Sequence, residues 1–113
     1  MISIDTNVLL RRLLHDDPFQ STRTDALFER DGAVLVTDIV LCEALWTLTG
    51  KRYRISRDDV VSVVVSLLRD PQIVLEDADA VWSAVDDFSI HKKADFPDAL
   101  IVNKSRRFAE RKD

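Results

Sequence analysis

The chain has 113 residues, of which 46% are hydrophobic and 32% charged, so it is suited to one folded domain and not to a disordered segment. Its formal net charge of −4 does not suggest a basic nucleic-acid-binding protein, although bound metal would neutralise some of its acids. Only 2 glycines and 3 prolines are present, which argues against a turn-rich all-β protein and for an α/β chain.

Three short apolar runs along the chain predict buried strands at residues 2–4, 33–36 and 73–75. The segments between and after them have the apolar spacing of helices. The expected helices span residues 7–14, 18–30, 38–49, 60–69, 76–88 and 97–110.

Local sequence signals mark several helix ends. Residues 16–18 combine an Asp cap with a proline at the first helical position, which predicts a helix restart there. Thr37 or Asp38 is expected to cap the next helix, which Gly50 ends. Residues 56–59 resemble a capping box, with an acid three residues after a serine.

The element order β-α-α-β-α-α-β-α-α predicts a single domain, residues 1–113, with a central parallel sheet flanked by helices. In such sheets, ligands bind at the carboxyl ends of the strands. Asp5 follows the first predicted strand and therefore lies at such an end.

Three acids occupy positions that folding alone does not favour. Asp5 ends an apolar run, Glu43 interrupts the apolar stretch 39–46, and Asp98 opens the last predicted helix. Burying an unpaired carboxylate in an apolar setting destabilises the fold by on the order of several kcal/mol. A shared divalent metal is the partner that this pattern suggests.

Each acid also has a structural interpretation. Asp5 is a possible helix cap, Glu43 is a possible solvent-facing residue beside a narrow apolar stripe, and Asp98 is favoured by the helix dipole. Asp95 is expected to be the helix cap or an acid supporting the site. Taken together, the acids predict an oxygen-only site that suits Mg²⁺ or Mn²⁺ better than zinc.

The histidines and the cysteine do not form a zinc motif, because His15, His91 and Cys42 are scattered along the chain. A single cysteine is compatible with a reducing compartment, and no apolar run is long enough to span a membrane, so we expect a cytoplasmic protein. Trp46 and Trp82 lie on apolar stripes and are expected in the core.

A basic run surrounds one tyrosine between two predicted helices. Lys51, Arg52 and Arg54, with Arg57 nearby, are candidates for binding RNA phosphates. The alternative is that this run is a solvated connection between helices.

Three segments, residues 2–10, 40–46 and 93–101, strongly resemble the motifs of PIN-domain proteins, particularly VapC-type toxins of toxin–antitoxin pairs. The likeness implies an endoribonuclease dependent on Mg²⁺ or Mn²⁺, with a three-layer fold. It implies Asp5, Glu43 and Asp98 as catalytic and metal-binding acids, with Thr6 or Asn7 supporting the site. It further implies an RNA substrate, an antitoxin partner and a homodimer.

The family pattern continues with a further strand and another acid, whereas this chain ends at Asp113. We therefore expect the last strand to be missing and the set of acids to be incomplete. This leaves a second interpretation, a catalytically impaired binding or decoy protein that keeps the fold and partner surface. A phosphatase of the haloacid-dehalogenase type is a third, but that family needs a second Asp where this chain has Asn7.

Overall fold

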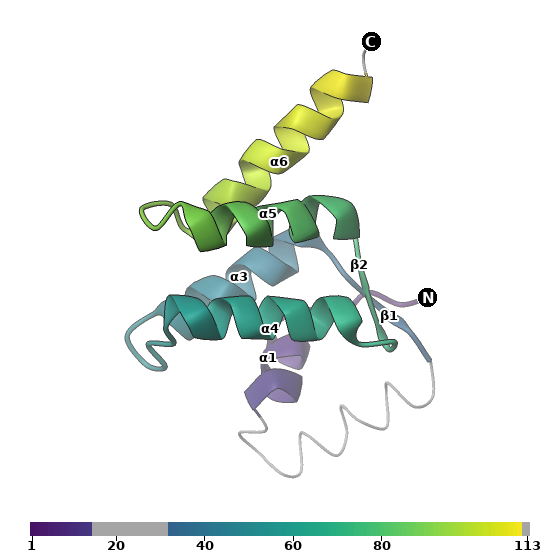
Figure 1. Cartoon of the computed structure of the whole chain (residues 1–113). Helices are drawn as coiled ribbons and strands as arrows, with labels where there is room; N and C mark the ends of the chain where they lie inside the picture. The colour runs from purple at the N-terminus through teal and green to yellow at the C-terminus, as the bar shows by residue number, and fades with distance from the viewer. Residues whose placement is uncertain (15–31, 112–113) are drawn as a thin grey trace.

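The computed structural model describes residues 1–14 and 32–111, which form helices around a small parallel sheet (Figure 1). In chain order the elements are α1 Thr6–Leu14, β1 Val34–Val36, α3 Asp38–Thr49, α4 Arg57–Arg69, β2 Ile73–Leu75, α5 Ala78–Ile90 and α6 Phe96–Arg111. The helix predicted at 18–30, its capping signal at 16–18 and His15 lie outside the described residues. Within the described part, no helix combines the length and apolar character that crossing a membrane requires.

The sheet pairs β1 with β2 in parallel, with Val34 opposite Ile73 and Val36 opposite Leu75. Val34 and Val36, which point to the same face of the sheet, are completely buried, whereas Leu35 between them is partly buried. The parallel arrangement confirms the predicted sheet class and places the ends of the strands at one common edge.

The first predicted strand is shorter than expected. Ser3 forms an isolated parallel bridge with Leu35, supported by Ile4 N donating to Leu35 O at 3.1 Å and Leu35 N donating to Ile2 O at 2.8 Å. Ile4 is buried but Ile2 is 39% exposed, so only one of its two isoleucines belongs to the core. The prediction of a fully buried strand at 2–4 was wrong in extent, although the segment does pair beside β1.

The predicted helix ends agree with the structure where local chemistry determines them. The Thr37 side chain accepts a hydrogen bond from Val40 N and begins α3, and Gly50 ends it. The capping box at the start of α4 is complete, since Ser56 Oγ accepts from Asp59 N and Asp59 accepts from Ser56 N. Because the box satisfies backbone donors at the helix start, α4 begins at Arg57, three residues before the predicted start.

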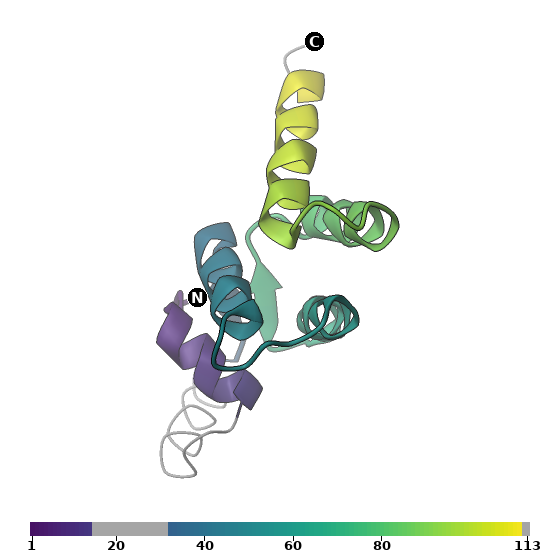
Figure 2. The same cartoon turned by 90° about the vertical axis from the view of Figure 1, so that its left-hand side faces the viewer.

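Helices cover the strands from both sides. Figure 2 shows α1 and α3 on one side of the strands and α4 on the other, while α6 extends away from the body of the protein. The core is formed by apolar side chains from every element, including Leu9 of α1, Leu41 of α3, Val64 of α4 and Val81 of α5. Each of these four is at most 1% exposed.

Arg57 connects the start of α4 to the end of α5. Its guanidinium donates to three carbonyl oxygens, those of Ala94 at 2.8 Å, Phe88 at 2.8 Å and His91 at 3.0 Å. It also lies over the Phe88 ring, with its central carbon 3.7 Å from the ring centroid. Carbonyls at a helix C-terminus lack partners inside the helix, so one arginine satisfies several of them here. Arg57 therefore has a structural role, joining the start of α4 to the end of α5.

Candidate functional site

Asp5 follows Ile4 at the carboxyl end of the bridged first segment. Its side chain is exposed, and its Oδ1 accepts a hydrogen bond from Val8 N at 2.9 Å, which caps α1. The capping interpretation is thus confirmed. Capping uses one carboxylate oxygen, and Oδ2 makes no hydrogen bond within the described residues, so it is available to a ligand.

Glu43 lies on the exposed side of α3, where Thr6 Oγ1 donates to its Oε2 at 3.0 Å. The hydroxyl of Thr6 therefore links the segment that carries Asp5 to the helix that carries Glu43. The solvent-facing interpretation of Glu43 is confirmed, and the idea of a buried acid was wrong. Asn7 is exposed in the first turn of α1, beside this pair.

Asp98 lies in the first turn of α6 and is exposed. Asp95 caps this helix, since its Oδ1 accepts from Asp98 N at 2.9 Å. Asp98 lines a hollow of about 170 Å³ that it shares with Asp87, His91 and Arg106. In residues 1–14 and 32–111, no three His, Cys, Asp or Glu side chains are grouped to hold a metal ion. The structure thus links Asp5 and Glu43 through Thr6 and does not group Asp98 with them.

The donor set at Asp5 and Glu43 fits a hard, strongly hydrated cation. Mg²⁺ in proteins is often held by one or two carboxylates and keeps several waters. Each of these acids has one carboxylate oxygen anchored by a hydrogen bond, through Val8 N or Thr6 Oγ1, which orients the other oxygen. Two exposed, oriented carboxylates therefore suit Mg²⁺ or Mn²⁺.

Sequence reasoning missed a cluster of charges at the carboxyl ends of β1 and β2. Asp38 follows β1, and Glu76 and Asp77 follow β2. Lys104 of α6 is hydrogen-bonded to Asp38, and its Nζ lies 3.7 Å from Glu76 Oε2 and 3.6 Å from Asp77 Oδ2. Asp38 N also donates to Glu76 Oε1 at 3.1 Å. This charge cluster holds α6 against the end of the sheet.

The charge cluster and its surroundings shift several pKa values. Burial raises the pKa of Asp38, against the opposing hydrogen bond from Lys104. The hydrogen bond to Asp38 raises the pKa of Lys104. Burial raises the pKa of the Cys42 thiol to about 11, and the charges of Asp38 and Asp95 add to the shift. Cys42 is therefore a protonated thiol at neutral pH and a poor metal ligand.

Replacing Lys104 by Met should lower the free energy of unfolding by about 1–2 kcal/mol at pH 7, because the mostly buried Asp38 loses its cation and Asp77 keeps only Arg107. Urea unfolding checks this, with exposed Lys93 replaced by Met as control. The raised pKa of Lys104 means that its stabilisation is present below about pH 10.5 and is lost as pH rises through the folded value. At acid pH the stability difference between wild type and Lys104→Met should shrink as the carboxylates become protonated. Asp38 should be protonated at a higher pH than usual, because its pKa is raised. If Lys104→Met is as stable as the wild type at pH 7, Lys104 does not stabilise the fold through the charge cluster.

The basic run lies in the turn between α3 and α4, where Lys51, Arg52 and Arg54 are exposed. Arg54 has a positive φ of 50° and its Nε donates to Lys51 O at 3.1 Å, which shapes the turn. The Arg52 guanidinium lies 5.1 Å from the Tyr53 ring centroid. The turn thus presents several cations to solvent.

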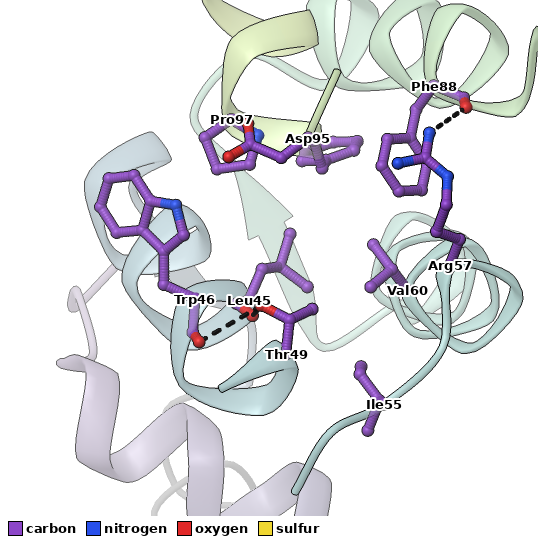
Figure 3. Close-up of a pocket in the computed structure, with 10 residues that line it drawn as sticks. Leu45, Trp46, Thr49, Ile55, Arg57, Val60, Phe88, Asp95 and Pro97 are labelled. Carbon is purple, nitrogen blue, oxygen red and sulfur yellow. Dashed lines mark hydrogen bonds between the residues drawn. The ribbon is translucent and has the colours of Figure 1, made fainter. Parts of the chain in front are cut away.

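A pocket of about 240 Å³ opens between α3, α4, α5 and the start of α6. Figure 3 shows Trp46, Asp95 and Pro97 on one side of it and Arg57 and Phe88 on the opposite side.

The two tryptophans are not core residues, contrary to the expectation from their apolar stripes. Trp46 is 55% exposed and Trp82 is 39% exposed. The apolar spacing of their helices continues onto faces that no other described element covers. Trp46 lines the pocket beside the candidate site, where an exposed aromatic ring is available to a ligand.

The comparisons with known proteins bear on this site. Comparison with curated proteins and with solved structures gives no match. The family model of the PIN domain matches residues 2–108, a span that includes Asp5, Glu43 and Asp98. PIN domains are generally metal-dependent nucleases. With a match over nearly its whole length and an α/β fold built on a parallel sheet, this chain belongs to the PIN domain family.

Proposed function

We propose that this protein is an endoribonuclease that requires Mg²⁺ or Mn²⁺ and acts as the VapC-type toxin of a toxin–antitoxin pair. The observation that carries the proposal is the link between Asp5 and Glu43 through Thr6, at the carboxyl end of the first segment of a PIN-family sheet. PIN-domain nucleases typically act on RNA and often belong to such pairs, which supports the choice of substrate and partner.

In this proposal Asp5 and Glu43 hold the cation, and Asp98 is a third acid for it. When bound, the cation neutralises phosphate charge and makes water a better nucleophile. The chain itself supplies orientation. Val8 N and Thr6 Oγ1 each anchor one oxygen of an acid. The exposed Lys51, Arg52 and Arg54 hold phosphates away from the acids, which would otherwise repel the RNA backbone.

The further features of the proposal follow from the family likeness. They are a single three-layer domain over residues 1–113, a homodimer, a cytoplasmic location and an antitoxin chain that covers the site. Growth arrest on expression, relieved by co-expression of a small protein encoded beside this one, is the expected cellular behaviour.

Removing the metal tests the activity directly. Labelled single-stranded RNA should be cleaved with Mg²⁺ or Mn²⁺ present, left intact in excess EDTA, and cleaved again when the metal is restored. Unchanged cleavage in EDTA would rule out the proposed chemistry. Mass spectrometry of the fragments then identifies the cut phosphodiester.

A second function, a non-catalytic binding or decoy protein, is favoured by one observation. Among residues 1–14 and 32–111, no group of three acids is arranged to hold a metal. Calorimetry separates the two functions. A folded protein that binds its antitoxin but shows neither heat on addition of Mn²⁺ nor cleavage of RNA would be the decoy.

A further inference from the structure

The pocket that Trp46 lines continues the proposed site along the same two helices. Trp46 follows Glu43 by three residues on α3, so the two side chains share a face and are offset by about 4.5 Å along the axis. Pro97, on the same side of the pocket as Trp46, directly precedes Asp98 (Figure 3). The pocket is thus lined by residues of the same helices that carry Glu43 and Asp98, although neither acid lines it.

The other end of the pocket meets the basic turn. Thr49 and Ile55 both line the pocket, and the exposed cations Lys51, Arg52 and Arg54 lie between them in the chain. The pocket thus lies between the helix that carries Glu43 and the basic turn, and Asp95 and Arg57 are the charged residues that line it. This charge distribution suits a neutral group joined to an anionic backbone, and aromatic rings beside basic side chains are how proteins bind single-stranded nucleic acids.

From this arrangement we infer that the pocket binds one unpaired base of the RNA substrate, with the Trp46 indole stacked on it. The inference rests on the proposed function for the identity of the polymer. At about 240 Å³ the cavity is smaller than the sites of drug-sized ligands and is suited to a single ring system. Trp46 is 55% exposed, and its indole N–H makes no hydrogen bond to residues 1–14 or 32–111.

The polar side chains of Thr49, Arg57 and Asp95 line the pocket and bear on which bases it accepts. Thr49 donates to Leu45 O and Arg57 to three backbone carbonyls, which leaves Asp95 to pair with a base. Asp95 Oδ1 is occupied by Asp98 N, but Oδ2 makes no hydrogen bond in the described part of the chain. A carboxylate oxygen accepts hydrogen bonds and pairs with exocyclic amino groups, such as N4 of cytosine. Uracil offers a carbonyl at that position and would be repelled. The pocket should therefore prefer cytosine to uracil.

Binding of fluorescein-labelled hexacytidylate and hexauridylate in EDTA tests the inference without cleavage. Fluorescence anisotropy should show that Trp46→Ala weakens binding of hexacytidylate by about tenfold, the effect of losing one stacked base. Trp46→Phe should retain most of the affinity. Trp82→Ala, which removes a partly exposed tryptophan outside the pocket, should leave it unchanged.

Two further variants extend the test. Trp82→Phe leaves Trp46 as the sole tryptophan of the chain, and its emission should change when hexacytidylate binds. Asp95→Asn keeps a good helix cap but removes the carboxylate, so the preference for hexacytidylate over hexauridylate should disappear. Thermal unfolding of each variant confirms that it is folded.

The outcomes separate this inference from the proposed function. Undiminished RNA binding by folded Trp46→Ala overturns the base pocket, even if the protein cleaves RNA with Mg²⁺. If RNA binding depends on Trp46 but no RNA is cleaved, the base pocket is supported and the proposed nuclease activity is rejected. If Trp46 emission responds to the protein encoded beside this one and not to RNA, the pocket belongs to a protein partner and the inference is overturned.

Discussion

Cleavage of single-stranded RNA should fall by about a hundredfold or more when Asp5 is replaced by Asn or Glu43 by Gln. Both changes are nearly isosteric and preserve hydrogen bonding. Asn at position 5 still caps α1 through its side-chain oxygen, and Gln at position 43 still accepts from Thr6 Oγ1. What each removes is the negative charge that attracts the cation. Activity should therefore be lost while the fold stays intact.

The measurement is the initial cleavage rate over a range of Mn²⁺ concentrations, together with thermal unfolding. Asp86→Asn makes the same charge change at an exposed position on α5 and is the matched control, with expected wild-type activity. Asp98→Asn tests the third acid separately, because the structure does not group it with the other two. Wild-type rates in folded Asp5→Asn and Glu43→Gln would remove these acids from the mechanism.

Replacing Arg57 by Ala should lower the free energy of unfolding by about 3 kcal/mol. The change removes charge-assisted hydrogen bonds to three carbonyl oxygens and the contact with the Phe88 ring. The carbonyls at the end of α5 then depend on water. Arg57→Lys should restore only part of the loss, because an ammonium lacks the planar fork that reaches several acceptors.

Urea denaturation followed by far-UV circular dichroism gives the comparison. Arg52→Ala is the control, since Arg52 is exposed in the turn before α4, and it should change stability by less than about 0.5 kcal/mol. The order of the two positions should be opposite for RNA affinity. Arg52→Ala should weaken RNA binding more than Arg57→Lys does. A loss below about 1 kcal/mol for Arg57→Ala would show that water replaces its contacts.

The features predicted most accurately from the sequence are those determined by near neighbours. The capping box of Ser56 and Asp59, the Thr37 cap and the stop at Gly50 each depend on atoms a few residues apart. The family motifs likewise identified Asp5, Thr6 and Glu43, and the structure links these residues. Local chemistry was sufficient for the caps because their interacting groups are close in the chain, whereas Thr6 and Glu43 meet across 37 positions and were named only through the family likeness.

The features that the sequence did not predict depend on distant contacts. Lys104 meets Asp38 across 66 positions of the chain, and no local pattern indicates that pairing. Helix α3 carries apolar residues on nearly all sides, so periodicity could not show that Ile39 and Trp46 face outward while Leu45 is buried. Which face is covered depends on where α1 and α6 pack. The position of Asp98 relative to Glu43 likewise depends on how α6 packs against α3.

The three-residue spacing of Glu43 and Trp46 has a consequence for the products of the proposed reaction. In the proposed ribonuclease, Glu43 and the base-stacking Trp46 project from one helix, so the backbone sets one spacing between this acid and the bound base for every RNA. Every fragment should then carry the preferred base at the same number of nucleotides from its new end. End-sequencing of fragments from a random RNA pool would show that fixed offset as a single enriched position.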